Sequence, residues 1–247
     1  MNCKEFGAGG RETVMLIHGG GLSWWNYREA ALILAHDHRV ILPILDGHAG
    51  SDCPFTTIES NAEEIIAWID GHLDGHVSLI GGLSLGGQVL LEMLSRRKDI
   101  CRSALVESAM AVPAAMTDAL IGPTLALSYG LIRNERFARL QFRSLRMKPE
   151  LFGDYYRDTC LIGRRDMIAF MKASAAYALK DAVAGCTARV RVFAGKKEVR
   201  GILKSAELIR SRIPGSTLTV LPGLYHGEFS INHADDYART VRELVDS

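Results

Sequence analysis

A glycine-flanked serine between two apolar segments constrains the fold of this chain most. Residues 79–88 read LIGGLSLGGQ, which contains the pattern G-x-S-x-G. Residues 77–80 are typical of a buried parallel strand, and residues 86–96 carry apolar side chains at helical spacing. A sharp turn between such a strand and a helix needs residues without a Cβ beside it, and it exposes the hydroxyl of Ser84 at the sheet edge. The segment therefore predicts a nucleophile elbow.

A glycine-rich loop that packs closely or holds a phosphate is the alternative interpretation of this segment. The phosphate-binding patterns G-x-x-x-x-G-K-[S/T] and G-x-G-x-x-G do not occur in the sequence. The elbow is therefore the favoured interpretation.

The rest of the chain alternates strand-like and helical patterns, which predicts an α/β fold with a mostly parallel central sheet and helices on both faces. Residues 1–12 leave room for one edge strand at most. The other strands that we expect are residues 13–17, 39–44, 77–80, 103–106, 190–194 and 217–221. The helices that we expect between them are residues 24–35, 56–73, 86–96, 203–213 and 234–245.

This alternation stops between residues 111 and 185, where the pattern is helical with breaks expected near Pro123, Pro149 and Gly163. The interruption predicts a helical cap inserted into the core. We therefore divide the chain into an N-terminal core part, a cap and a C-terminal core part: residues 1–110, 111–185 and 186–247. Several side chains there are compatible with an adaptable pocket or with ordinary core: Met110, Met116, Met167, Phe170 and Met171.

Charge and hydropathy exclude several classes of partner. The 247 residues include 29 Lys and Arg against 28 Asp and Glu, so a net charge of +1 gives no general attraction to nucleic acid or to a membrane surface. Apolar runs end well before a membrane-spanning length, and residues 1–11 lack the pattern of a signal peptide. The 5 cysteines are scattered and never form C-x-x-C. We expect a cytoplasmic protein with reduced cysteines, no cofactor and no metal.

The candidate catalytic residues follow from the chemistry of serine. A serine hydroxyl attacks a carbonyl only with a neighbouring base, and an imidazole base needs a carboxylate to orient it and to stabilise its cation. The chain supplies Ser84, Glu198 and His226 in this order, each at or just beyond the end of an expected strand. The carboxyl ends of parallel strands share one edge of a sheet, so we expect the three side chains to meet there.

Three other residues compete for the roles of base and acid. His48 lies in a turn-rich stretch before the serine, and no partner is indicated by its spacing. His233 lies in the approach to the last helix, whereas His226 directly follows a strand and its turn. Glu107, at the end of the strand over residues 103–106, is the alternative acid. We expect none of the three to replace the residues above.

A run of glycines after the strand over residues 13–17 is the candidate oxyanion site. The run is His18-Gly19-Gly20-Gly21. Backbone N–H groups of glycines after a strand can point into a cavity, which is what an oxyanion needs, although a tight turn has the same composition. The pairing of this run with the elbow is typical of one enzyme architecture.

In these features the chain resembles the α/β-hydrolase family. The resemblance covers both flanks of the chain and rests on residues 18–20, residues 46–48, the elbow at Ser84, Glu198 and His226. The stretch over residues 111–185 does not contribute to it. The resemblance implies that Ser84 is the nucleophile, His226 the base and Glu198 the acid.

The resemblance also implies that the N–H groups of Leu85 and of Gly20 or Gly21 bind the oxyanion. Two residues depart from the family pattern. The family more often has Asp where Glu198 stands, and the G-H-G-x-S turn has Ala49 at its third position. The longer glutamate can reach the imidazole if its backbone retracts slightly.

The expected function is a serine hydrolase that forms an acyl-enzyme on Ser84, most simply with a carboxylic ester that carries a small or medium acyl group. Serine argues against epoxide and haloalkane hydrolysis, for which this family uses Asp. Thioesters, lactones and carbon–carbon bonds stay open as substrates, because the same serine and oxyanion site serve each. A ligand-binding protein of hydrolase fold without turnover is the competing class. The expected partner is a small molecule, and the sequence does not predict an oligomeric state.

Five arginines recur every three or four residues within the expected cap. They are Arg133, Arg136, Arg139, Arg143 and Arg146. This spacing predicts one stripe on a single helix, with Phe137 and Leu140 on an apolar side. We expect the stripe to face solvent, and binding of an anionic substrate or partner is the alternative.

Overall fold

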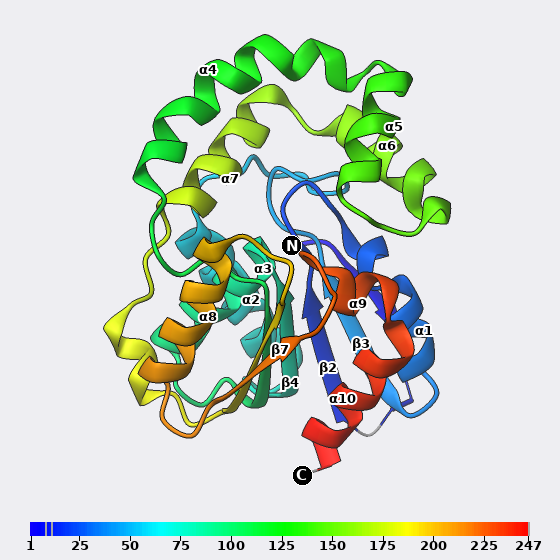
Figure 1. The fold of residues 1–247 in the computed structure, drawn as a ribbon. Coiled ribbons are helices and arrows are strands. Elements are labelled where there is room, and N and C mark those ends of the chain that lie inside the picture. Colours follow the sequence, from blue (N-terminus) through cyan, green and yellow to red (C-terminus); the bar gives the residue numbers. More distant parts are fainter. Residues whose placement is uncertain (8, 11, 247) are drawn as a thin grey trace.

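A sheet of 7 strands in the order β1-β3-β2-β4-β5-β6-β7 forms the centre of the molecule (Figure 1). The computed structural model describes residues 1–7, 9, 10 and 12–246, without the side chains of residues 115–120, 126 and 127. Only β1 runs antiparallel to its neighbour, β3. The strands are β1 (Cys3–Phe6), β2 (Glu12–Ile17), β3 (His38–Pro43), β4 (Val77–Leu83), β5 (Cys101–Glu107), β6 (Arg189–Gly195) and β7 (Thr217–Leu221).

Helices cover both faces of this sheet (Figure 1). One face carries α1 (Arg28–Leu34) and α10 (Ala234–Asp246), and the other carries α2 (Ile58–His72), α3 (Leu85–Arg96) and α8 (Arg200–Arg212). Each pair of layers encloses its own apolar cluster, so the central strand β4 is buried along its whole length. A strand buried on both faces explains the continuous apolar run before Ser84.

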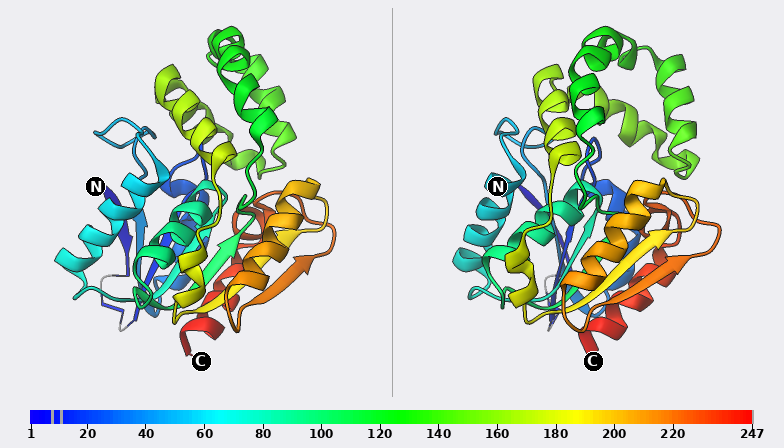
Figure 2. Two further views of the ribbon diagram at one scale, coloured as in Figure 1. Left: turned by 90° about the vertical axis from the view of Figure 1, so that its left-hand side faces the viewer. Right: turned by 60° about the vertical axis from the view of Figure 1, so that its left-hand side comes forward.

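The chain between β5 and β6 forms an arch of helices beyond one end of the sheet (Figure 2). The arch consists of α4 (Ala115–Ile132), α5 (Glu135–Ser144), η2 (Pro149–Leu151), α6 (Phe152–Leu161) and α7 (Arg164–Ala176), and η3 (Asp181–Gly185) leads back to β6. The Gln88 amide on α3 donates to the carbonyl of Ser174 at 2.9 Å, and the Trp25 ring donates to Asp158 Oδ2 at 2.8 Å. These bonds tie both sides of the arch to the core.

Three details differ from the expectations. The helix expected over residues 24–35 divides into η1 (Trp24–Tyr27) and α1, and the short helix α9 (Glu228–Asn232) was not predicted. The break expected at Pro123 is absent, because α4 continues through this residue and packs along α7. Tertiary contact therefore outweighs the local cost of proline in a helix. Within the described residues, no helix is both long enough and apolar enough to span a membrane.

Candidate active site

Ser84 lies in the turn between β4 and α3 with a strained backbone. Its φ of 52° and ψ of −112° lie outside the backbone conformations that non-glycine residues prefer. Its N–H donates to the carbonyl of Glu107 at 2.9 Å. A Cβ on Gly82 would collide with the Gly86 carbonyl, and a Cβ on Gly86 would collide with the Ile17 carbonyl. Only residues without side chains allow the strand and the helix to approach this closely.

Glu198 and His226 form a hydrogen-bonded pair beyond the ends of β6 and β7. His226 Nδ1 lies 2.7 Å from Glu198 Oε2, while Glu198 Oε1 accepts the Gly195 N–H at 2.8 Å and the Ser108 hydroxyl at 2.7 Å. The Glu198 side chain is 0% exposed, whereas the His226 side chain is 49% exposed. The carboxylate is thus held by three donors, and the imidazole keeps Nε2 available on its open side.

The environment of Glu198 keeps its carboxyl group ionised. Burial by itself raises the pKa of this group, but the hydrogen bond and charge of His226, together with the bonds from Ser108 and Gly195, outweigh burial and lower the pKa. An ionised carboxylate beside Nδ1 favours the imidazole tautomer whose Nε2 accepts a proton.

Ser108 is a site residue that sequence reasoning missed. It is 2% exposed, has a φ of 55° and donates its N–H to the carbonyl of Phe193 on β6 at 2.9 Å. This backbone conformation aims its hydroxyl at Glu198. The available signal is weak, since Ser108 is only a polar residue directly after a strand.

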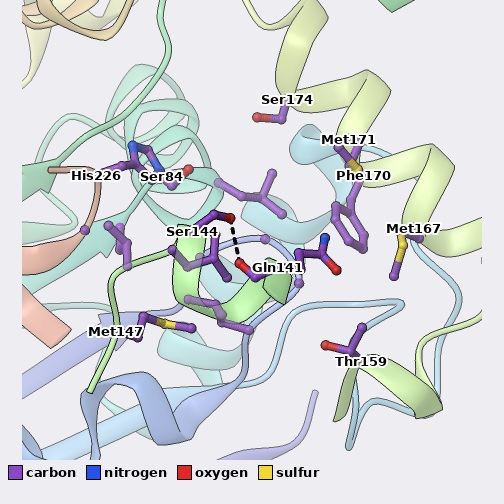
Figure 3. A pocket seen from close by; sticks show the side chains of 18 of the residues that line it. Ser84, Gln141, Ser144, Met147, Thr159, Met167, Phe170, Met171, Ser174 and His226 are labelled. Atoms are coloured by element: carbon purple, nitrogen blue, oxygen red, sulfur yellow. Dashed lines mark hydrogen bonds between the residues drawn. The ribbon is translucent and has the colours of Figure 1, made fainter. Parts of the chain in front are cut away.

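Ser84 and His226 line the same cavity (Figure 3), and Glu198 lines it as well, so the structure brings all three predicted residues to one edge of the sheet. Ser84 comes from the end of β4, Glu198 from the turn after β6, and His226 from the turn after β7. No hydrogen bond joins Ser84 to His226 in the part of the chain that the structure describes. In proteins without substrate such bonds are often long and tighten when substrate binds.

The glycine run after β2 reaches the elbow at Gly20. A Cβ on Gly20 would lie 3.4 Å from Leu85 Cδ2, so the two residues are neighbours. The Leu85 N–H opens α3 and therefore has no intrahelical acceptor. The Gly20 N–H has no acceptor among the described residues, whereas the Gly21 N–H donates to His48 Nε2 at 3.0 Å. Gly21 is therefore already engaged, and Gly20 and Leu85 keep free donors.

His48 and His18 are buried and use their ring nitrogens to hold loops. His48 Nδ1 lies 2.9 Å from the carbonyl of Asp46, and His18 Nε2 accepts the Leu45 N–H at 3.0 Å. Burial lowers the pKa of His48 to about 4 and that of His18 to about 3. Both nitrogens of His48 are thus occupied by backbone groups, which leaves it no nitrogen for a base at Ser84.

Glu107 and His233 lie outside the hydrogen-bonded pair. Glu107 Oε1 accepts the Ser230 N–H at 3.2 Å, and its Oε2 has no partner among the described residues. Burial raises the pKa of Glu107 to about 7. His233 ends α9 and does not line the cavity that contains Ser84. The structure therefore places neither residue where the alternative roles would require it.

The cavity above Ser84 has a volume of about 690 Å³ and lies between the sheet and the arch (Figure 3). Its lining is mostly apolar and includes Met110, Met147, Met167, Phe170 and Met171. The Met116 side chain lies outside the described residues. The ionisable side chains among the described lining residues are Tyr155, Lys197, Glu198, Tyr225 and His226. No arginine of the described chain lines this cavity.

Fold and site together define an α/β enzyme with a serine elbow. The sequence pattern of the alpha/beta hydrolase family matches residues 14–242, and the chain belongs to this family. No curated protein has a sequence that matches the chain.

Solved structures share this fold at low sequence identity. An esterase from Thermogutta terrifontis, solved with malate bound, is 19% identical with a TM-score of 0.79, and the match covers 99% of this chain and 92% of the esterase. An enol-lactonase from Burkholderia xenovorans is 16% identical with a TM-score of 0.84, covering 100% and 96%. A meta-cleavage product hydrolase from Pseudomonas fluorescens is 22% identical with a TM-score of 0.77, covering 99% and 93%.

Proposed function

We propose that the protein is a serine hydrolase that forms an acyl-enzyme on Ser84, with carboxylic esters as its substrates. The observation that carries the proposal is the strained elbow serine in one cavity with the Glu198–His226 pair, whose Nε2 is left free. The hydrolase family and the esterase among the structural relatives support the reaction class.

In the first half-reaction, His226 Nε2 removes the hydroxyl proton of Ser84 while the oxygen attacks the ester carbonyl. The tetrahedral oxyanion accepts hydrogen bonds from the N–H groups of Gly20 and Leu85. The charge of Glu198 stabilises the imidazolium, which then protonates the departing alcohol as the carbon–oxygen bond breaks. Water activated by His226 then adds to the acyl-enzyme. The resulting tetrahedral intermediate collapses and releases the acid, while His226 returns a proton to the oxygen of Ser84.

The acyl group occupies the apolar cavity under the arch in this proposal, so residues 111–185 act as a cap. An acyl group without charge fits the apolar part of this wall, because a carboxylate buried away from a cation is strongly disfavoured, and Lys197, the lysine among the described lining residues, is exposed and lies beside Glu198 in the sequence. Thioesters, lactones and carbon–carbon bonds remain alternative substrates on the same residues, and the enol-lactonase and the meta-cleavage product hydrolase give the last two weight.

Covalent labelling tests the nucleophile. A fluorescent organophosphonate should modify the wild-type chain at Ser84 and should not modify the variant Ser84→Ala, with the labelled peptide identified by mass spectrometry. The wild type should release a burst of p-nitrophenol from a p-nitrophenyl ester, because the acyl-enzyme forms faster than it is hydrolysed. A labelled residue elsewhere, or ligand binding without a burst, contradicts the proposal.

Paired variants test the base and the acid. Ser84→Ala, His226→Ala and the double variant should each lose about 10³-fold or more in kcat, and the double variant should be no worse than either single one, because the two residues act as a unit. Glu198→Gln should be severe and Glu107→Gln mild, since Glu198 hydrogen-bonds the imidazole, whereas Glu107 bonds the Ser230 N–H. The reverse ranking would transfer the role of acid to Glu107.

A further inference from the structure

Arg146 leaves the arch and packs on the residue that precedes the proposed base. It follows α5 directly after the helix cap at Leu145. Its guanidinium carbon Cζ lies 3.9 Å from the centroid of the Tyr225 ring, which is a close cation–π distance. Arg146 is exposed, but it lies beyond the end of α5 and packs on Tyr225, so it does not continue the helical stripe that its spacing in the sequence suggested.

Two further residues close a ring of contacts around this pair. Asn232 on α9 donates its side-chain amide to the carbonyl of Arg146 at 2.7 Å and lies 3.5 Å from Glu228 Oε1. Glu228 Oε2 accepts the N–H of Tyr225 at 2.6 Å. Tyr225 is thus held through its ring from the arch and through its backbone from α9.

The backbone of Arg146 supports a role for its side chain. Its φ of 56° lies in the left-handed region, where glycine is the usual residue after a helix. The non-glycine residues with positive φ in the described chain are Asp74, Ser84, Ser108 and Arg146. Two of the other three belong to the candidate site, and strained backbone conformations cluster at functional sites, so the left-handed backbone of Arg146 is consistent with a role of its guanidinium in that site.

His226 depends on its backbone for its position. Its side chain is 49% exposed and makes one hydrogen bond among the described residues, to Glu198. Tyr225 precedes it and lines the same cavity. A shift of Tyr225 would therefore move the imidazole relative to Ser84.

We propose that Arg146 is a positioning residue for hydrolysis: it clamps Tyr225 from the arch and thereby fixes His226 beside Ser84. The assignment rests on the proposed function. Arg146 touches neither Ser84 nor His226 among the contacts that the structure describes, so its effect passes through Tyr225.

The variant Arg146→Gly separates positioning from folding, because glycine relieves the left-handed backbone while it removes the guanidinium. We expect its thermal midpoint to stay equal or rise, while kcat for p-nitrophenyl acetate and the rate of organophosphonate labelling of Ser84 both fall about tenfold, as small misplacements of catalytic groups do. KM should change little, since an acetyl group is too short to need the arch. Arg146→Lys, which keeps a cation over the ring, should recover much of the loss.

Arg143→Ala, at an exposed position of α5, is the matched control and should retain wild-type rates. Combining Arg146→Gly with Tyr225→Leu should cost no more than Tyr225→Leu alone. If the wild type is labelled at Ser84 and Arg146→Gly keeps wild-type rates, the role of Arg146 is overturned, while the proposed function stands. Absence of labelling in the wild type would overturn the proposed function and this role with it.

Discussion

Glu198 Oε1 turns back to the Gly195 N–H of its own turn, and the Ser108 hydroxyl meets the same oxygen from β5. Glutamate is one methylene longer than aspartate, so an unrestrained side chain would present its carboxylate in many positions. The two donors on Oε1 leave Oε2 directed at the imidazole of His226. These two bonds therefore hold the longer acid in one orientation, with Oε2 on the imidazole.

Ser108→Ala tests this arrangement. Hydrogen bonds to charged groups contribute about 1.5–3 kcal/mol, so we expect kcat to fall about tenfold while the fold is kept. The Ser108 bond lowers the pKa of Glu198, so its removal raises that pKa. In a logarithmic pH profile, the additional loss of activity that comes from protonation of this carboxylate should begin at a higher pH than in the wild type. The measurement is a pH profile of kcat for a p-nitrophenyl ester. Ser211→Ala, whose hydroxyl bonds a carbonyl within α8, is the control. An unchanged kcat and profile would remove Ser108 from the site.

At the scale of helices and strands, the features that could be predicted are those that depend on residues close together in the sequence. The strand β7 has the expected bounds, Thr217–Leu221, because five alternating or apolar residues between turns leave little choice. The elbow was predictable because its chemistry demands glycines at fixed positions around Ser84. The order of serine, acid and histidine along the chain was equally visible.

Features that depend on distant partners escaped prediction. The continuation of α4 through Pro123 depends on α7, and the engagement of Gly21 depends on His48, which follows it by 27 residues. Arg146 looked like a member of a stripe because its partner Tyr225 lies on another part of the chain. Spacing along one helix contains no information about such partners.

The helix α5 presents different residues to the cavity and to solvent. Phe137, Gln141 and Ser144 line the cavity, whereas Arg136, Arg139 and Arg143 are exposed. Arg139 pairs with Glu135 at 2.6 Å, and its guanidinium lies over the Phe152 ring. Leu140 is 67% exposed, which contradicts its expected place on an apolar side. Arg133 lies before the helix, so the stripe on α5 is shorter than predicted.

We therefore predict that changing Arg136, Arg139 and Arg143 together to Gln leaves kcat/KM nearly unchanged for neutral esters and for esters with an acidic acyl group. Exposed ion pairs contribute roughly 0–1 kcal/mol each, and none of these three residues lines the cavity. The measurement compares p-nitrophenyl hexanoate with its carboxylate-ended analogue at low and high salt. A salt-sensitive preference for the anionic ester, abolished in the triple variant, would show that the stripe guides substrates.

Across the whole molecule, two buried histidines join the loops that follow β2 and β3. His18 accepts a backbone N–H from Leu45, and His48 accepts one from Gly21, so each bond needs a neutral ring. Their pKa values lie far below the unperturbed 6.5, because burial disfavours the charged form. The loop that carries Gly20, one of the proposed oxyanion donors, is thus held by hydrogen bonds that are lost when these two rings are protonated.

The contribution of these two histidines to stability should therefore decrease as pH falls below about 6.5, while Glu107, whose pKa burial raises to about 7, takes up a proton in the folded chain and offsets part of this loss. In this range the unfolded chain binds protons at these histidines and the folded chain does not, so acid favours unfolding. Urea unfolding between pH 7 and 5 measures the slope. His48→Gln should reduce the slope, whereas His72→Gln on the exposed end of α2 should not. Identical slopes in all three proteins would contradict the assignment.

The last helix closes the fold against the first. Arg242 on α10 bonds Asp37 at 2.9 Å and the carbonyl of Ile33 at 2.8 Å, which joins parts of the chain 205 and 209 residues apart. During synthesis on the ribosome, the elbow and the glycine run emerge early, and the histidine and its closing helix emerge last. Because α10 covers its part of this sheet face only after it is synthesised, the nascent chain carries Ser84 long before it carries His226, the proposed base.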